Sequence, residues 1–241
     1  MRNYTRREIL RIAAAVVPVA LLSSWFSRIA HAAAKFRIPG AVTSPQYVYL
    51  KPAEIKFLDA AVDRLIPADY FGPGAREAGV TLFIDHQLAG PYGQAARWYM
   101  EGPWVDGTPE QGYQLKYTPA QLYRIAIRHV DDYCRKTFDN HTFSELSDDD
   151  KDTVLKRLEA GKVNLADVPS ATFFDFLMHN TRNGFLSDPI YGGNRDFAGW
   201  KLLGFPGPRY NYVDEITRYG VPYDEPTVGL MGRDGSPLTK A

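Results

Sequence analysis

Helix-capping residues stand before apolar repeats of helical period at two places in the chain, and this pattern limits the fold more than any other feature. Thr118 is followed by Pro119, a capping hydroxyl before a proline at the first helical position. The apolar spacing that follows predicts a helix to about Thr137. Ser147 precedes three aspartates that suit the positive end of a helix, and Gly161 is placed to end that helix. The middle of the chain is therefore predicted to be helical.

Other segments extend the helical prediction in both directions. Apolar residues recur at helical spacing over about 52–66, 75–88 and 170–184, and residues 95–100 are expected to add a turn or two. Residues 101–117 are predicted to form a loop. We therefore expect a mainly α protein, with a compact helical domain of about five or six helices.

The helical period ends near Gly184. Residues 185–241 hold many of the glycines and prolines, and only short strands such as Trp200 to Leu203 fit the pattern. The segment is too apolar and aromatic for a simple disordered tail. We expect a long irregular Gly/Pro/aromatic C-terminal arm that lies against its own domain or against another chain.

The sequence of the N-terminus predicts an export signal. The stretch TRREILR (5–11) resembles the twin-arginine export consensus, with Arg6 and Arg7 as the paired arginines. The twin-arginine translocase carries proteins that are already folded, often with a cofactor inserted. A chain with this signal and no cofactor motif of its own is expected to travel with a partner that holds the cofactor.

Signal cleavage is predicted between Ala32 and Ala33. An uncharged run from Ile12 to Ser27 is short for a membrane span, and a small-x-small site (Ala-His-Ala) ends at Ala32. The alternative is an uncleaved N-terminal anchor.

Composition excludes several classes of function. The formal net charge is zero, so nucleic-acid binding is not expected. The single cysteine, Cys134, cannot form an internal disulfide or a CxxCH haem attachment. The aromatic content of 13% fits an interface, a carbohydrate-binding surface or an aromatic core, and composition does not separate these.

No motif in the chain predicts catalysis or cofactor binding. Residues 72–79 begin like a dinucleotide fingerprint but have the wrong spacing. The five histidines show no i, i+4 pair, so no metal site is expected. His179 and Asn180 are neighbours on a predicted helix, where adjacent side chains point about 100° apart. We therefore predict no catalytic, cofactor-binding or metal-binding residue in this chain.

The candidate interface lies in the stretch DPIYGGNRDFAGWKLLGFPGPR (188–209). Tyr191-Gly192-Gly193-Asn194 permits positive φ angles, so the chain can leave the last long helix sharply. Trp200 and Phe205 then form an aromatic ridge, which we expect to pack on a partner subunit or on the chain's own helices. The alternative is a sugar-binding pocket between Tyr191 and Trp200.

Two stretches of distinctive sequence carry a family resemblance. They are LIPADYFGPGAREAGVTLFIDHQLAG (65–90) and FFDFLMHNTRNGFLSDPIYGGNRDFAGWKLLGFPGPR (173–209). With the leader, they resemble the small subunit (subunit 3) of membrane-bound gluconate 2-dehydrogenase and of related fructose and sorbitol dehydrogenases. The resemblance covers most of residues 50–210. It divides the chain into a twin-arginine signal (1–32), a subunit 3-like domain (33–210) and a C-terminal extension (211–241).

The resemblance implies a heterotrimer at the periplasmic side of the inner membrane. A large FAD-containing subunit oxidises D-gluconate to 2-dehydro-D-gluconate, and a multihaem cytochrome c subunit passes the electrons to quinone. The resemblance also implies that the small chain holds neither FAD nor haem c and has no catalytic residue. Its implied role is to support maturation and twin-arginine export of the flavoprotein.

Three alternatives remain open at this stage. The partner enzyme can be a fructose, sorbitol or 2-ketogluconate dehydrogenase, because specificity would lie in the partner. The chain can be a free-standing periplasmic enzyme or sugar-binding protein. It can also be a chaperone that dissociates after export.

Overall fold

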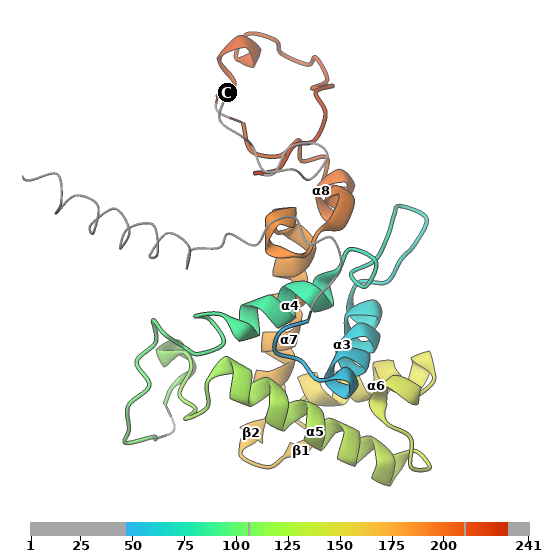
Figure 1. Ribbon diagram of the computed structural model, residues 1–241, viewed down its shortest axis with the longest axis vertical. Coiled ribbons are helices and arrows are strands. Elements are labelled where there is room, and N and C mark those ends of the chain that lie inside the picture. The colour runs from blue at the N-terminus through green and yellow to red at the C-terminus, as the bar shows by residue number, and fades with distance from the viewer. Residues whose placement is uncertain (1–46, 106, 210, 231–241) are drawn as a thin grey trace, which may run out of the picture. The chain divides into compact units, whose positions relative to one another are not determined.

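The computed structural model describes residues 47–105, 107–209 and 211–230 (Figure 1). The described helices are α3 (Pro52–Leu65), α4 (Val80–Ala89), α5 (Pro119–Thr137), α6 (Asp148–Glu159), α7 (Ser170–Leu186) and α8 (Ala198–Leu203). Short 3-10 turns lie at Pro109–Gln111, Phe143–Glu145, Pro189–Tyr191, Arg195–Phe197 and Val213–Glu215. The predicted mainly α fold is confirmed. Within the described residues, no helix has both the length and the apolar character to cross a membrane.

Both predicted caps are present. The Thr118 side chain accepts a hydrogen bond from the Gln121 N–H, and the Gln121 side chain accepts one from the Thr118 N–H, which makes a reciprocal capping box. The Ser147 hydroxyl accepts from the Asp150 N–H at 3.2 Å. Gly161 has φ +71° and its N–H donates to Leu158 O, as expected for a glycine that ends a helix. Local sequence chemistry therefore sets the bounds of α5 and α6.

Two predicted elements differ from the structure. α4 begins at Val80 instead of Ala75, because Gly79 has φ +78° and the residues before it form turns. The predicted strand Trp200 to Leu203 is wrong, since these residues belong to α8, which ends at Gly204 with φ +67°. The two strands of the described residues pair with each other: β1 (Asn164–Leu165) and β2 (Val168–Pro169) are antiparallel, with Leu165 opposite Val168.

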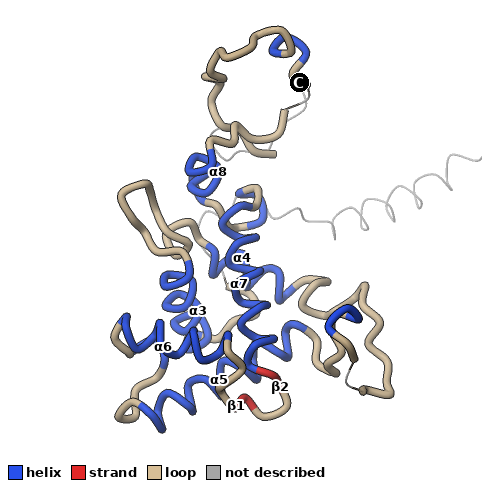
Figure 2. Tube along the Cα trace, turned by 180° about the vertical axis from the view of Figure 1, so that it is seen from behind, coloured by secondary structure: helices blue, strands red, loops and turns tan. Residues whose placement is uncertain are grey.

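The core forms where α7 packs against α4, α5 and α6. Figure 2 shows α3 to α7 gathered together, with the short strands beside α5. Phe57, Tyr123, Phe143 and Phe173 are fully buried. The ring of Phe173 lies 5.6 Å from that of Tyr123 and 6.3 Å from that of Phe57, measured between centroids. These rings join α3, α5 and α7 into one hydrophobic cluster.

A buried polar contact fixes the segment after α4 to this core. The Asn180 side-chain amide donates to the hydroxyls of Tyr92 at 3.1 Å and Tyr123 at 2.8 Å. The Tyr123 hydroxyl donates in turn to Phe176 O. Asn180 is thus a satisfied core residue that links the loop after α4 to α5 and α7.

The first described residues are held by a buried carboxylate on α4. Asp85 accepts hydrogen bonds from the N–H groups of Val48 at 2.7 Å, Tyr49 at 3.0 Å and Leu50 at 2.7 Å. The Asp85 side chain is completely shielded from solvent. The entry of the chain into the domain is therefore fixed before α3 begins.

Candidate functional site

The predicted leader residues cannot be placed, because Arg6, Arg7, Ala32 and Ala33 lie outside the described residues. The candidate interface, residues 188–209, lies entirely within the described residues. It begins at Asp188, whose buried carboxylate accepts from the N–H groups of Ile190 at 3.0 Å and Leu230 at 2.7 Å. This one side chain ties the start of the segment to a residue 42 positions further along the chain.

Glycines in this segment allow backbone to lie directly on backbone. A Cβ added at Gly193 would lie 2.2 Å from Gly184 O, and one added at Gly199 would lie 2.1 Å from Phe185 O. The expected positive φ occurs at Gly192 (+95°) and Asn194 (+47°). Gly193 therefore serves a close approach to α7, while Gly192 supplies the turn.

Asn194 acts as the internal anchor of the turn. Its side-chain amide donates to Ser187 O at 2.7 Å, and its side-chain oxygen accepts from the Gly199 N–H at 2.8 Å. The neighbouring Arg195 N–H donates to Ala78 O at 2.9 Å. Asn194 is fully buried, so both ends of its amide are used inside the protein.

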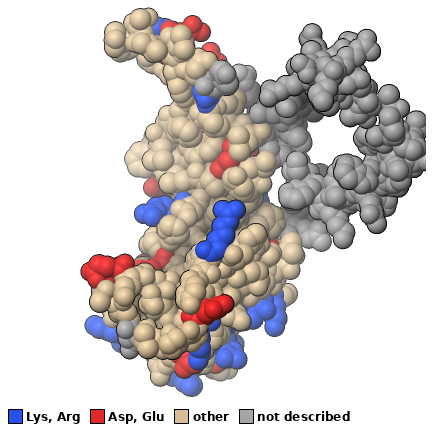
Figure 3. All heavy atoms as spheres, turned by 90° about the vertical axis from the view of Figure 1, so that its left-hand side faces the viewer, with Lys and Arg blue, Asp and Glu red and all other residues tan. Residues whose placement is uncertain are grey.

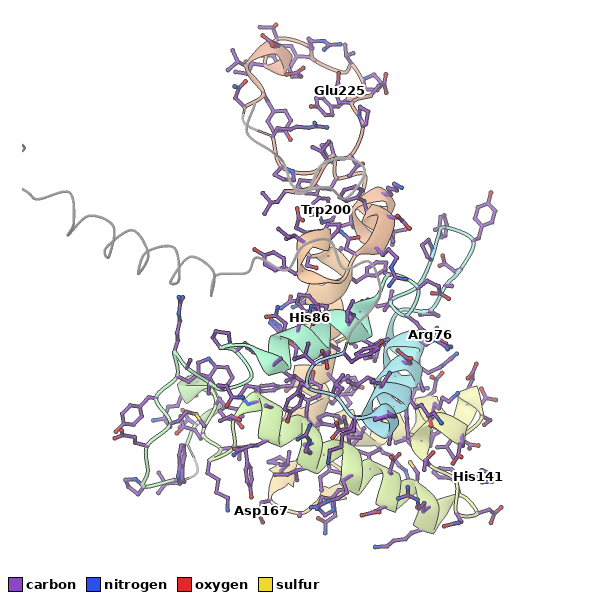
Figure 4. The ribbon with its side chains drawn as sticks, in the orientation of Figure 1. Arg76, His86, His141, Asp167, Trp200 and Glu225 are labelled. Atoms are coloured by element: carbon purple, nitrogen blue, oxygen red, sulfur yellow. The ribbon has the colours of Figure 1, made fainter. Side chains whose placement is uncertain are left out.

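Trp200 faces the interior of this arrangement. Its indole N–H donates to Leu186 O at 2.7 Å. Its ring stacks on Phe197 at an interplanar angle of 18° and meets Phe205 edge to face at a centroid distance of 5.0 Å. Trp200 is part of α8, and Figure 4 labels it there. Trp200 therefore locks the arm to the chain's own α7, and any contribution to an interface would be indirect.

The exposed part of the segment is apolar. Tyr191 is 51% exposed, Phe205 41% and Leu203 65%, and Leu202 is half exposed as well. Phe71 and Leu202 line a groove of about 290 Å³ together with Pro73, Glu77, Arg195, Asp196, Ala198 and Lys201. We call the exposed side chains of Phe71, Leu202, Leu203 and Phe205 the α8 patch.

The sequence pattern did not identify Phe71, Leu202 or Leu203 as exposed residues of a candidate surface. A signal for Phe71 was present, because Tyr70 and Phe71 are aromatic residues in a Pro/Gly turn with no helix of their own to cover them. The two leucines gave no such signal, because α8 was read as a strand. In the view of Figure 3, uncharged residues predominate between the charged groups of the helical part and those at the far end of the C-terminal loop.

Other candidate residues separate in the structure. Asn180 is buried in the core, whereas His179 is exposed and its Nε2 lies 2.8 Å from Asn183 Nδ2. In Figure 4, His86 lies on α4 and His141 near the far end of α5. No cluster of three or more His, Cys, Asp or Glu side chains that could hold a metal occurs in the described ranges. Burial raises the pKa of Cys134 to about 12, so its thiol stays protonated.

The family comparison covers the helical domain and the candidate segment together. The model of the family "Gluconate 2-dehydrogenase subunit 3" matches residues 52–207, from the first residue of α3 to a point beyond α8. No curated protein and no solved structure matches in the corresponding comparisons. Because the family match spans more than half of the chain and includes the Gly193–Trp200 turn, the protein belongs to the gluconate 2-dehydrogenase subunit 3 family.

Proposed function

We propose that the chain is the non-catalytic small subunit of a membrane-associated, heterotrimeric gluconate 2-dehydrogenase in the periplasm. The observation that carries this proposal is the family match over residues 52–207. A subunit of this family implies association with other gluconate dehydrogenase subunits. In the proposal these are a flavoprotein that holds FAD and oxidises D-gluconate to 2-dehydro-D-gluconate, and a cytochrome that holds haem c and reduces quinone.

The α8 patch supports a role in assembly. Phe71 is 75% exposed and Leu202 51% exposed, and both side chains line the groove of about 290 Å³. Exposed apolar side chains that share one groove are typical of a surface that another protein covers. The single cysteine is consistent with a haem that is held by a partner subunit, since covalent haem attachment requires two cysteines in a CxxCH motif.

The export role is tested by changing the paired arginines of the leader. We expect the double substitution Arg6→Lys and Arg7→Lys to leave the flavoprotein in the cytoplasm or to cause its degradation. Arg2→Lys with Arg11→Lys is the matched control, because it changes two other leader arginines in the same way. Dehydrogenase activity measured in the periplasmic fraction separates the two strains. Normal periplasmic activity in the Arg6/Arg7 strain would rule out the export role.

Assembly is tested by affinity capture of the chain followed by an absorption spectrum. We expect flavin and c-type haem bands in fixed ratio to the chain. Activity of the captured complex toward gluconate, fructose, sorbitol and 2-ketogluconate then identifies the substrate. A colourless chain that elutes alone would contradict the proposal, and gluconate binding by that chain would support a free-standing sugar-binding protein.

The α8 patch is tested with Leu202→Ser and Leu203→Ser. Because both side chains are exposed, the substitutions should leave the melting temperature unchanged and lower the yield of captured flavin. Val48→Ser, at an aliphatic residue that is 70% exposed outside the patch, serves as the control. Equal flavin yield from the patch variants and the control would show that the patch does not contact the flavoprotein.

A further inference from the structure

The C-terminal arm closes on itself to form a loop. The Val228 N–H donates to Pro206 O at 3.2 Å, and the Arg209 guanidinium donates to Pro226 O at 2.5 Å. Gly207 allows this contact, because a Cβ there would lie 1.8 Å from Val228 O. We call residues 206–209 and 211–228 the closed loop. Figures 1 and 2 show that it returns to its starting point next to α8.

The closed loop is fixed to the domain at its base. Leu230 donates to the buried carboxylate of Asp188, as described above. A Cβ at Gly229 would lie 2.9 Å from Asp188 Oδ2 and 3.1 Å from the ring of Phe197, so the backbone passes close to the turn after α7. The loop therefore leaves from and returns to the same part of the protein, which is typical of a functional surface loop.

A pocket of about 460 Å³ opens within the closed loop. Among the described residues, its lining comes from the loop: Pro206, Tyr212, Glu215, Arg218, Val221, Pro222, Tyr223, Asp224 and Glu225. The rings of Tyr212 and Tyr223 lie 5.7 Å apart at an interplanar angle of 60°. Figure 4 shows Glu225 on this loop. Two aromatic rings and several carboxylates thus face a common space.

The pocket has excess negative charge. Glu215 pairs with Arg218 at 3.6 Å. In the described part of the chain, neither Asp224 nor Glu225 forms an ion pair. The loop already places one guanidinium on a tyrosine, since Arg209 lies 5.5 Å from the Tyr223 ring. Tyrosine faces and unpaired carboxylates together favour a cationic ligand.

The tip of the closed loop favours a protein as the source of that cation. Val213, Ile216, Tyr219 and Val221 are 64%, 63%, 87% and 52% exposed. The described residues of the loop leave these side chains largely uncovered, although both ends of the loop are fixed. We call these four exposed side chains the rim of the loop. Apolar side chains around a charged pocket are typical of a protein interface in which an arginine or lysine of the partner enters the pocket.

We propose that the closed loop docks a partner protein by enclosing one basic side chain, arginine or lysine, in the pocket lined by Tyr212, Tyr223, Asp224 and Glu225. Apolar residues that flank this basic side chain cover the exposed rim of the loop. The identification of the partner as the flavoprotein subunit rests on the function proposed above. The chemistry of the pocket does not depend on that identification.

The interface is tested by removing charge from the pocket without changing side-chain size. We expect Asp224→Asn with Glu225→Gln to weaken retention of the flavoprotein about tenfold, measured as the dissociation rate of the captured complex. Asp214→Asn is the matched control for Asp224→Asn, because Asp214 is an exposed aspartate of the same loop that does not line the pocket. A dissociation rate equal to that of the control would overturn the docking proposal and leave the family role intact.

A peptide probe tests the pocket without the partner. Acetyl-Ala-Arg-Ala-amide should shift the NMR signals of residues 212–225 of the purified full chain, and the citrulline peptide, which is neutral and of similar shape, should not. The Asp224→Asn/Glu225→Gln variant should lose the response to the arginine peptide while its melting temperature stays unchanged. Equal shifts with the arginine and citrulline peptides would refute the proposal that the pocket binds a basic side chain. The absence of shifts with both acetyl-Ala-Arg-Ala-amide and its lysine counterpart, acetyl-Ala-Lys-Ala-amide, would also refute it. If the wild-type chain captures no flavoprotein, the proposed function fails, and the peptide result still decides the pocket.

Discussion

Replacing Asp85 with alanine removes the acceptor that three backbone N–H groups share, those of Val48, Tyr49 and Leu50. Alanine cannot accept any of these bonds, and the completely buried position gives water little access to the site. We therefore expect Asp85→Ala to release the segment that leads into α3 and to destabilise the whole domain.

The magnitude follows from the burial of the three bonds. The Leu50 N–H bond is buried, so its loss should cost about 1–3 kcal/mol. The Val48 and Tyr49 bonds are partly buried, and replacement by water should limit their loss to about 0.5–1 kcal/mol each. The free energy of unfolding should therefore fall by about 3 kcal/mol, equivalent to about 6–12 °C in melting temperature for a domain of this size.

Thermal unfolding followed by circular dichroism measures this effect. Asp175→Ala is the matched control, because Asp175 is an exposed aspartate on α7. Asp85→Asn should recover only part of the loss, since one carboxylate oxygen becomes an NH₂ group that faces N–H donors. Limited proteolysis should also cut near residues 47–50 sooner in Asp85→Ala. A melting temperature within about 2 °C of the control would refute the reasoning, because it would correspond to less than one hydrogen bond.

Three further predictions concern packing, pH and thiol reactivity. Gly193→Ala should lower the free energy of unfolding, measured in urea, by about 3 kcal/mol because its Cβ would meet Gly184 O. Gly161→Ala is the control: Gly161 has open space around it, so the substitution should cost only about 1 kcal/mol for the positive φ. Arg64→Gln should lower the free energy of unfolding by about 0.5–1 kcal/mol at neutral pH, because it removes the ion pair with Asp152. The Arg64 hydrogen bond lowers the pKa of Asp152. The difference in stability between wild type and variant should therefore be complete above the ordinary aspartate pKa and disappear as pH falls through the lowered pKa. Cys134 should resist alkylation by iodoacetamide in the folded protein at about pH 8, because burial raises the pKa of its thiol to about 12. The thiol should react once the protein is unfolded in urea. Fast alkylation of the folded protein would contradict the buried position of Cys134.

The sequence by itself determined the helices whose signals are local. The caps at Thr118 and Ser147 and the stop at Gly161 act within four residues of chain, so they could be read without the fold. The start of α4 was misread because the apolar pattern continues through Gly79, where the backbone turns. The family resemblance was also visible in the sequence, and the match over residues 52–207 confirms it.

Only the tertiary structure decided how the candidate segment packs on the rest of the domain. Gly193 is required because the backbone of α7 passes close to it, and Trp200 is internal because Leu186 O is within reach of its indole N–H. The contact between Asp188 and Leu230 joins residues 42 positions apart. No local pattern encodes such approaches, because they depend on where α7 and the arm meet in space. Gly193 and Gly199 are positions of close packing and Gly192 supplies the turn, whereas the exposed apolar side chains lie beyond them on α8 and the closed loop.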